Sequence, residues 1–74
     1  MNLEKRSLNL AGHATSVALE PEFWSALEAL AAARGQSLAA LVRDIDQGRG
    51  ERPLASACRV TALVTCAQLS DKSP

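Results

Sequence analysis

The sequence is poor in aromatic residues, with one Phe, one Trp and no Tyr among its 74 residues. Its hydrophobic fraction of 47% is carried largely by Ala, Leu and Val. A chain of this length buries little surface, and without large side chains a core made by one copy would be thin. We therefore expect a single domain that is stabilised by a second copy of the same chain.

Long apolar runs are also missing. No segment reaches the ~18 apolar residues that span a bilayer. The N-terminus, with Glu4, Lys5 and Arg6 before mixed residues, lacks the apolar core of a signal peptide. The sequence accordingly predicts a soluble, cytoplasmic protein with no membrane partner.

Metal ligands and nucleophiles are scarce. His13 is the only histidine, and the two cysteines, Cys58 and Cys66, form no Cys-x-x-Cys pattern. Eight residues apart on a helix, they would lie ~12 Å from each other, too far for a disulfide within the chain. Two small buried side chains are the simpler interpretation, and a disulfide across a dimer or a redox sensor remains the alternative.

Features of enzymes are missing as well. Asp44 and Asp46 would point about 200° apart around a helix and so form no catalytic pair of carboxylates. Gly48-x-Gly50 lacks the third glycine and the preceding strand of a nucleotide-binding loop. We expect no enzymatic activity, no cofactor and no metal.

The sequence does contain a change of hydrophobic period at Glu20-Pro21. Before it, residues alternate as in a strand, with Thr15, Val17 and Leu19 on the more apolar face. The opposite face would carry Ala14, Ser16 and Ala18. Pro21 suits the first position of a helix, where its missing N–H costs nothing, and Glu20 would be the cap.

Two helices should follow this strand. The first has an apolar stripe and ends at Gly35, since glycine accepts the left-handed conformation common after a helix. Ser37 caps the second. The stripe residues of the two helices are Phe23, Trp24, Leu27, Leu30 and Ala31, then Leu38, Leu41, Val42 and Ile45.

The N-terminal arm has a different phase from the strand. Leu8 and Leu10 are apolar at even positions, whereas Val17 and Leu19 are apolar at odd ones. One regular strand cannot bury both pairs on one face. We therefore predict a bulge or kink at Gly12.

The segment Ala11 to Trp24 reads AGHATSVALEPEFW. It resembles the pattern Ala-Gly-His-x-Thr-Ser-Val-x-Leu-Glu-Pro-x-Phe-Trp of a bacterial branch of the ribbon-helix-helix family, which includes the Arc and methionine repressors. The resemblance covers roughly Lys5 to Val64. It continues in Arg34-Gly35-Gln36-Ser37-Leu38, Ile45-Asp46, Leu54-Ala55-Ser56-Ala57 and Arg59-Val60.

This resemblance implies a mainly α fold with one short β-strand per copy. Two copies would intertwine as a homodimer, with an antiparallel two-stranded ribbon between them above four helices. A third helix is expected near the C-terminus, although its β-branched residues also suit a strand, because the alternation fails at Ala62-Leu63-Val64 and the branch is helical there. The expected segments are an arm at 1–11, a ribbon-helix-helix core at 12–47, a loop at 48–53, the third helix at 54–69 and a frayed tail at 70–74.

The resemblance also implies a site, because family members commonly lay the ribbon in the major groove of DNA. The base-reading side chains would be Ala14, Ser16 and Ala18. Amide groups at Gln36, Ser37 and Leu38 would hold a phosphate. A local basic patch would combine Lys5, Arg6, Arg49 and Arg52.

Two observations weaken direct reading of bases. Related sequences tend to carry Arg at the position of Ala14 and Ser at that of Ala18, whereas alanine can only touch a thymine methyl. The formal net charge is zero, while DNA-binding domains are often basic. One hypothesis is a homodimeric, double-stranded-DNA-binding transcription regulator of bacterial or phage origin. The other is a dimer that binds another protein, as an antitoxin, a phage-encoded inhibitor or an assembly factor, without sequence-specific DNA reading.

Overall fold

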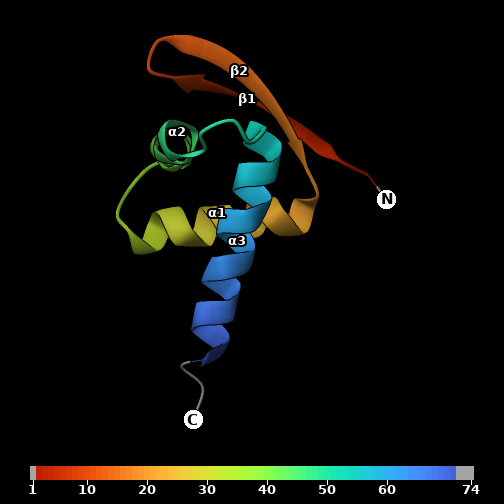
Figure 1. Ribbon diagram of the computed structural model, residues 1–74, viewed down its shortest axis with the longest axis vertical. Coiled ribbons are helices and arrows are strands. Elements are labelled where there is room, and N and C mark those ends of the chain that lie inside the picture. Colours follow the sequence, from red (N-terminus) through yellow and green to blue (C-terminus); the bar gives the residue numbers. More distant parts are fainter. Residues whose placement is uncertain (1, 72–74) are drawn as a thin grey trace.

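The chain forms a β-hairpin followed by three helices. A computed structural model describes the backbone of residues 2–71 and the side chains of residues 2–65. The hairpin covers one end of the helices, and the C-terminal helix extends from the opposite end (Figure 1). The elements are β1 (Glu4–Leu10), β2 (His13–Leu19), α1 (Pro21–Ala33), α2 (Leu38–Gly48) and α3 (Leu54–Asp71).

The hairpin has a two-residue turn. β1 and β2 are antiparallel, and Leu10 lies opposite His13, so that only Ala11 and Gly12 connect them. Both turn residues have positive φ angles, 52° and 88°, as the tight turns that match the twist of a hairpin require. The side-chain oxygen of Asn9 accepts a hydrogen bond from the Gly12 amide at 3.2 Å and so stabilises the turn.

This pairing corrects the expectation of one strand in each copy. The predicted strand does exist, and it pairs with the N-terminal arm of the same chain. The physical reason is the turn at Ala11-Gly12, which folds the arm back along β2. Two strands are therefore present in each copy, and the partner that the backbone of β2 requires is available locally.

The same turn explains the change of phase. In an antiparallel pair, residues directly opposite each other share a face. Leu8 is opposite Thr15 and Arg6 is opposite Val17, so even positions of β1 and odd positions of β2 lie on one side. The phase changes at Gly12, where a bulge or kink was expected, but a hairpin turn and not an extra residue changes the face.

The helices begin where the sequence predicted. Pro21 is the first residue of α1, and Glu20 occupies the cap position without a side-chain hydrogen bond to the helix. At the other end, Gly35 has a φ of 67°, and the amides of Gly35 and Gln36 donate to the carbonyls of Ala32 and Ala31. This double closure is a Schellman motif, in which the glycine accepts the left-handed conformation.

α2 starts at the predicted cap. The Ser37 hydroxyl accepts a hydrogen bond from the Ala40 amide at 3.1 Å. α3 is helical, as favoured, and runs to Asp71, beyond the expected end at residue 69. Residues 72–74 of the predicted tail lie outside the described residues.

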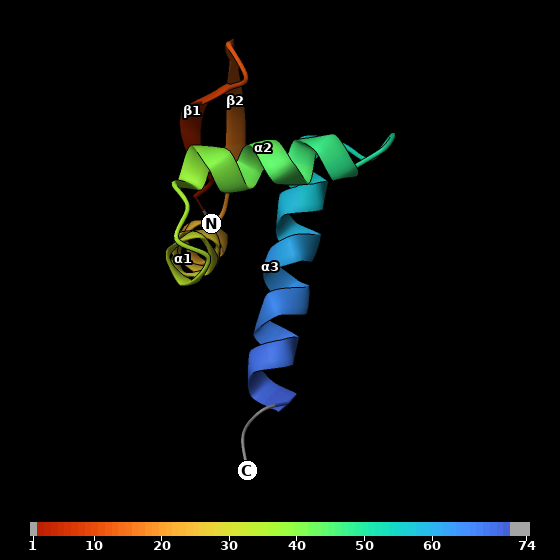
Figure 2. The ribbon, with the colours of Figure 1, turned by 90° about the vertical axis from the view of Figure 1, so that its left-hand side faces the viewer.

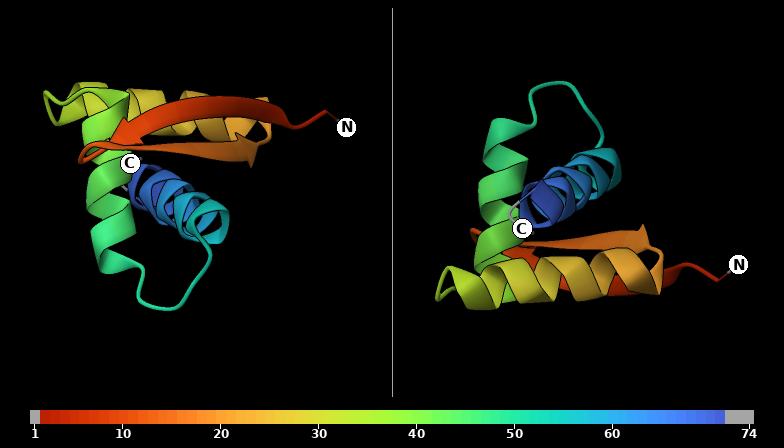
Figure 3. Two further views of the ribbon diagram at one scale, coloured as in Figure 1. Left: turned by 90° about the horizontal axis from the view of Figure 1, so that it is seen from above. Right: turned by 90° about the horizontal axis from the view of Figure 1, so that it is seen from below.

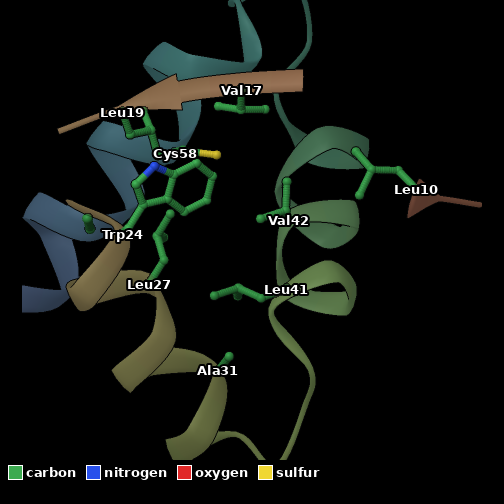
Figure 4. Close-up of a cluster of buried hydrophobic side chains, with 10 residues drawn as sticks. Leu10, Val17, Leu19, Trp24, Leu27, Ala31, Leu41, Val42 and Cys58 are labelled. Atoms are coloured by element: carbon green, nitrogen blue, oxygen red, sulfur yellow. The ribbon is translucent and has the colours of Figure 1, made fainter. Parts of the chain in front are cut away.

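One core joins the elements of a single chain. Side chains from β2, α1, α2 and α3 point toward one another (Figure 4). Trp24 is 1% exposed, and Leu27 and Leu41 are fully buried, which confirms their predicted place in the core. The buried cluster consists of Leu10, Val17, Leu19, Trp24, Leu27, Ala31, Leu41, Val42, Cys58 and Ala62.

Cys58 is the described member of the cysteine pair. It is fully buried in α3, as the simpler interpretation of the cysteines expected, and burial raises the pKa of its thiol to about 11. A thiol of this kind is mostly protonated at neutral pH and therefore a weak nucleophile. The side chain of Cys66 lies outside the described residues.

Candidate nucleic-acid interface

The hairpin has one face directed away from the helices. Alternation along each strand places six side chains on it, and five of the six are exposed, while Ala18 is half-buried. We call this the outer face. It consists of Lys5, Ser7 and Asn9 from β1 and Ala14, Ser16 and Ala18 from β2.

Cross-strand pairs build the outer face. Lys5 lies opposite Ala18, Asn9 lies opposite Ala14, and Ser7 lies opposite Ser16. The hydroxyl oxygens of the two serines are 3.4 Å apart, close enough for one to donate to the other. The outer face thus has polar side chains along β1 and small side chains along β2. Lys5 is the only charged residue among its six members.

The predicted row of Ala14, Ser16 and Ala18 lies on the outward side of β2, as expected, but it makes up only half of the outer face. Sequence reasoning did not identify Ser7 and Asn9. The signal was the antiparallel pairing, because odd positions of β1 join even positions of β2 once the turn at Ala11-Gly12 is recognised. These two residues add hydrogen-bonding groups beside alanines that have none.

The predicted phosphate contacts are already engaged in local structure. The backbone amide of Gln36 donates to Ala31, and its side-chain amide donates to Asp44 at 3.0 Å. The Ser37 hydroxyl is held by the Ala40 amide. Only the first backbone amides of α2, beginning at Leu38, remain without partners within the helix, as in any helix.

The electrostatic environment there is mixed. A helix N-terminus favours an anion, but the Asp44 carboxylate is drawn toward the preceding loop by Gln36. The side-chain oxygen of Gln36 is buried with no hydrogen-bond partner among the described residues. The first half of α2 lies below the hairpin in Figure 2, and the view from above in Figure 3 shows that α2 begins at the turn end. The first amides of α2 therefore lie close to the hairpin that carries the outer face.

The four residues of the predicted basic patch do not come together. Arg6 lies on the inner side of the hairpin, opposite Val17, with its guanidinium 4.8 Å from the centre of the Trp24 ring. It donates to Glu28 at 3.0 Å and to Glu4, and these hydrogen bonds raise the pKa of Arg6 above its usual value. Only Lys5 of the two arm cations therefore belongs to the outer face.

The other two members lie in the loop after α2. Arg49 donates to the Asp46 carboxylate at 2.6 Å and to the carbonyl of Arg52 at 2.8 Å, so much of its hydrogen-bonding capacity is used within the loop. The loop is at the end of α2 that points away from the hairpin (Figure 3). Arg49 and Arg52 thus form a separate basic segment.

A further cation is paired at the base of the hairpin. Arg59 of α3 donates to the Glu20 carboxylate at 3.0 Å and so ties the start of α3 to the start of α1. The pKa of Glu20 is lowered, first by a hydrogen bond from its own backbone amide and then by Arg59. This ion pair joins two elements of the fold and uses the hydrogen-bonding capacity of both groups within the chain.

Among the described residues, no helix combines the length and the apolar character that crossing a membrane requires.

Comparisons with known proteins agree with this geometry. Searches of curated proteins and of solved structures gave no match. A family model described as a ribbon-helix-helix domain matches residues 3–66, a range that contains the hairpin, α1, α2 and the described side chains of α3. Members of that family are generally DNA-binding regulators, and this chain belongs to the ribbon-helix-helix domain family.

Proposed function

We propose that this protein is a homodimeric DNA-binding regulator that contacts the major groove of double-stranded DNA with the outer face of its hairpin. The observation that carries the proposal is the outer face itself, an exposed two-stranded antiparallel surface with polar side chains from β1. The major groove of B-form DNA is wide enough to admit a two-stranded β-ribbon.

The chemistry of the outer face favours a nucleic acid over a cationic partner. Its six side chains include one cation, Lys5, and no carboxylate. Serine hydroxyls can donate to or accept from bases and phosphates, and the amide of Asn9 retains its N–H donors while its oxygen holds the turn. Ser7, Asn9 and Ser16 would contact base edges, and Lys5 would contact a phosphate.

The small residues of β2 have a defined place in this proposal. Ala14 and Ala18 let the ribbon approach the groove closely and can contact thymine methyl groups. The first amides of α2, at Leu38, would hold a phosphate near the turn end of the hairpin. Arg6, Arg49 and Arg52 have no direct part in the contact.

A second function is favoured by a specific observation, the smooth row made by Ala14, Ser16 and Ala18. Close packing against a protein surface suits small side chains, and a net charge of zero adds little general attraction to DNA. In this alternative the dimer uses the same outer face to bind another protein, as an antitoxin, an inhibitor or an assembly factor would.

The test compares two arginine substitutions of equal charge. Ala14→Arg adds a guanine-seeking side chain to the outer face, whereas Ala29→Arg adds the same side chain to the exposed surface of α1. Binding to a pool of mixed-sequence duplexes is titrated at several salt concentrations, beginning near ~50 mM. We expect Ala14→Arg to bind a guanine-containing subset tighter by ~1–3 kcal/mol, with Ala29→Arg close to the parent.

The salt dependence adds a second measurement. Each phosphate that a cation neutralises contributes about 0.9 to the slope of log affinity against log salt. Lys5→Ala should lower that slope by about one per copy in contact with DNA. Equal effects of the two arginines would contradict the outer-face proposal, and absence of binding by the parent even at the lowest salt would favour the protein-binding alternative.

A further inference from the structure

The outer face carries an unlike pair of side chains next to the hairpin turn. Asn9 of β1 lies directly opposite Ala14 of β2, and both are exposed. Opposite residues of an antiparallel pair have Cβ atoms about 4.5–5.5 Å apart, so the Asn9 amide and the Ala14 methyl group lie side by side. We call these two residues the turn-end pair.

The Asn9 side chain is held in one orientation. Its oxygen accepts a hydrogen bond from the Gly12 amide at 3.2 Å. Because a backbone N–H can only donate, the atom that faces Gly12 must be the side-chain oxygen and not the nitrogen. A side chain that is fixed before binding loses less conformational entropy when it meets a ligand.

The bond to Gly12 leaves most of the hydrogen-bonding capacity of this amide. A side-chain amide has two lone pairs on its oxygen and two N–H donors on its nitrogen. Within the described side chains, Asn9 therefore keeps one acceptor position and both donors on an exposed group. In the major groove, adenine offers the complement, the acceptor N7 beside the N6 donor.

The methyl group of Ala14 complements the other base of the same pair. Thymine presents a methyl group in the major groove, and alanine is one of the side chains that contact it. Ala14 has no polar atom that could form a hydrogen bond with guanine or cytosine. The turn-end pair thus matches A·T base pairs, with an amide for adenine and a methyl group for thymine.

The rest of the outer face has no comparable group for G·C pairs. Guanine is most often read by a bidentate arginine or lysine, and cytosine by a carboxylate. The outer face has no arginine and no carboxylate, and Lys5 lies opposite Ala18, at the end of the hairpin away from the turn. The hydroxyl groups of Ser7 and Ser16, 3.4 Å apart, suit several bases alike.

We infer that the turn-end pair makes this protein select A·T base pairs, with Asn9 bound to N6 and N7 of adenine and Ala14 against a thymine methyl group. The inference rests on the proposed function for the approach of the outer face to the major groove. It deepens that function by naming the residues and the class of base pair that decide specificity. The opposite end of the hairpin, at Lys5, adds affinity without selecting a base.

The test begins with a selection from random-sequence duplexes at ~50 mM salt, which should enrich A·T pairs at fixed positions. The best duplex is then made with 7-deazaadenine, in which a C–H group replaces N7, and separately with uracil, which lacks the thymine methyl group. The parent should bind the 7-deazaadenine duplex about tenfold more weakly, the order by which one bidentate contact discriminates. The loss with uracil should be about fourfold, as for one buried methyl group.

Substitutions in β1 connect this loss to one side chain. Asn9→Ala should no longer distinguish adenine from 7-deazaadenine, whereas the matched control Ser7→Ala, at an exposed position of the same face, should keep the distinction. Asn9→Asp retains an acceptor for the Gly12 amide but loses the N–H donors, so it repeats the test with the turn bond present. Each comparison is the ratio of two affinities of one variant, so that changes in folding or charge cancel.

Three results would overturn the inference: no enrichment of A·T pairs, a parent that binds adenine and 7-deazaadenine equally well, or an Asn9→Asp variant that still distinguishes them. Lys5→Ala, measured on the same duplexes, separates this inference from the proposed function. If Lys5→Ala lowers the salt dependence while the base analogues make no difference, the turn-end pair does not select A·T pairs and the outer-face proposal stands. A parent that binds no duplex at the lowest salt contradicts the proposed function itself, and the inference with it.

Discussion

Trp24 is the residue whose removal should change stability most. Its ring is 1% exposed and lies in the centre of the buried cluster. Its indole N–H donates to the carbonyl of Glu4 at 2.7 Å, and the Arg6 guanidinium lies over the ring. One side chain thus joins α1 to the core and to the first residues of β1.

The expected loss follows from these contacts. Replacing a buried Trp by Ala costs ~3–5 kcal/mol through lost transfer energy and the cavity left behind. The hydrogen bond to Glu4 adds about 1 kcal/mol. Because a domain of this length is stable by roughly 4–11 kcal/mol, Trp24→Ala should lose most of its free energy of unfolding.

Urea denaturation followed by far-ultraviolet circular dichroism measures this loss, since Trp24 is the only tryptophan and fluorescence would disappear with it. Protein concentration must be fixed, because association changes apparent stability. Trp24→Phe is the matched control, which keeps an aromatic ring but removes the N–H donor, and it should cost about 1–2 kcal/mol. An unchanged midpoint for Trp24→Ala would refute the assignment of Trp24 to the core.

Three further substitutions test local features of the fold. Gly12→Ala should lower the free energy of unfolding by about 1–2 kcal/mol through its backbone alone. The φ of 88° is unfavourable for alanine, and beyond the neighbouring residues no atom lies within 4 Å of the added carbon. An unchanged denaturation midpoint would contradict the tight turn. Ser37→Ala removes the cap of the Ala40 amide and should cost ~1 kcal/mol, whereas no loss would show that the cap contributes nothing. Glu20→Gln should destabilise the protein at neutral pH, because the pKa of Glu20 lies below its ordinary 4.5 in the folded state. The ionised carboxylate of Glu20 therefore contributes to the free energy of unfolding above pH 4.5, and this contribution is lost as the pH falls through the lower folded pKa. The difference in midpoint between the parent and Glu20→Gln should therefore shrink as the pH falls below 4.5, and a difference that is independent of pH would argue against the hydrogen bonds that Glu20 accepts from its own backbone amide and from Arg59.

The helices could be predicted because their signals are local. Pro21 begins α1, Gly35 follows the end of α1, and Ser37 caps the start of α2. Each acts through its own backbone or the neighbouring amides. The inward row of β2 could be predicted for a similar reason, since alternation alone decides which side chains of a strand are buried. The identity of its partner strand could not be read from that alternation.

β1 was missed because its inner side contains charged residues. Glu4 and Arg6 lie on the side that faces the helices, where a sequence pattern would require apolar residues. Arg6 is tolerated there because its guanidinium packs over Trp24 and pairs with Glu4 and Glu28. The contacts with Trp24 and Glu28 join residues 18 and 22 positions apart in the sequence, so no local pattern predicts them.

The candidate site was likewise predictable where one strand decides it and unpredictable where two strands must pair. The row made by Ala14, Ser16 and Ala18 follows from one strand, but Ser7 and Asn9 become part of the surface only through pairing between strands. The residues of the predicted basic patch lie apart in the chain because the patch was assembled from charge along the sequence, whereas the fold directs Arg6 inward and places Arg49 at the far end of α2.

Mapping of backbone amides by nuclear magnetic resonance tests the central claim most directly. A ¹⁵N-labelled sample is titrated with a mixed-sequence duplex at low salt, and amide shifts are followed for every element. The account predicts that the shifts concentrate in β1, β2 and the first residues of α2, with little change in the second half of α3. Shifts confined to the loop around Arg49 or to α3, or no shifts at all, would contradict binding of DNA by the outer face.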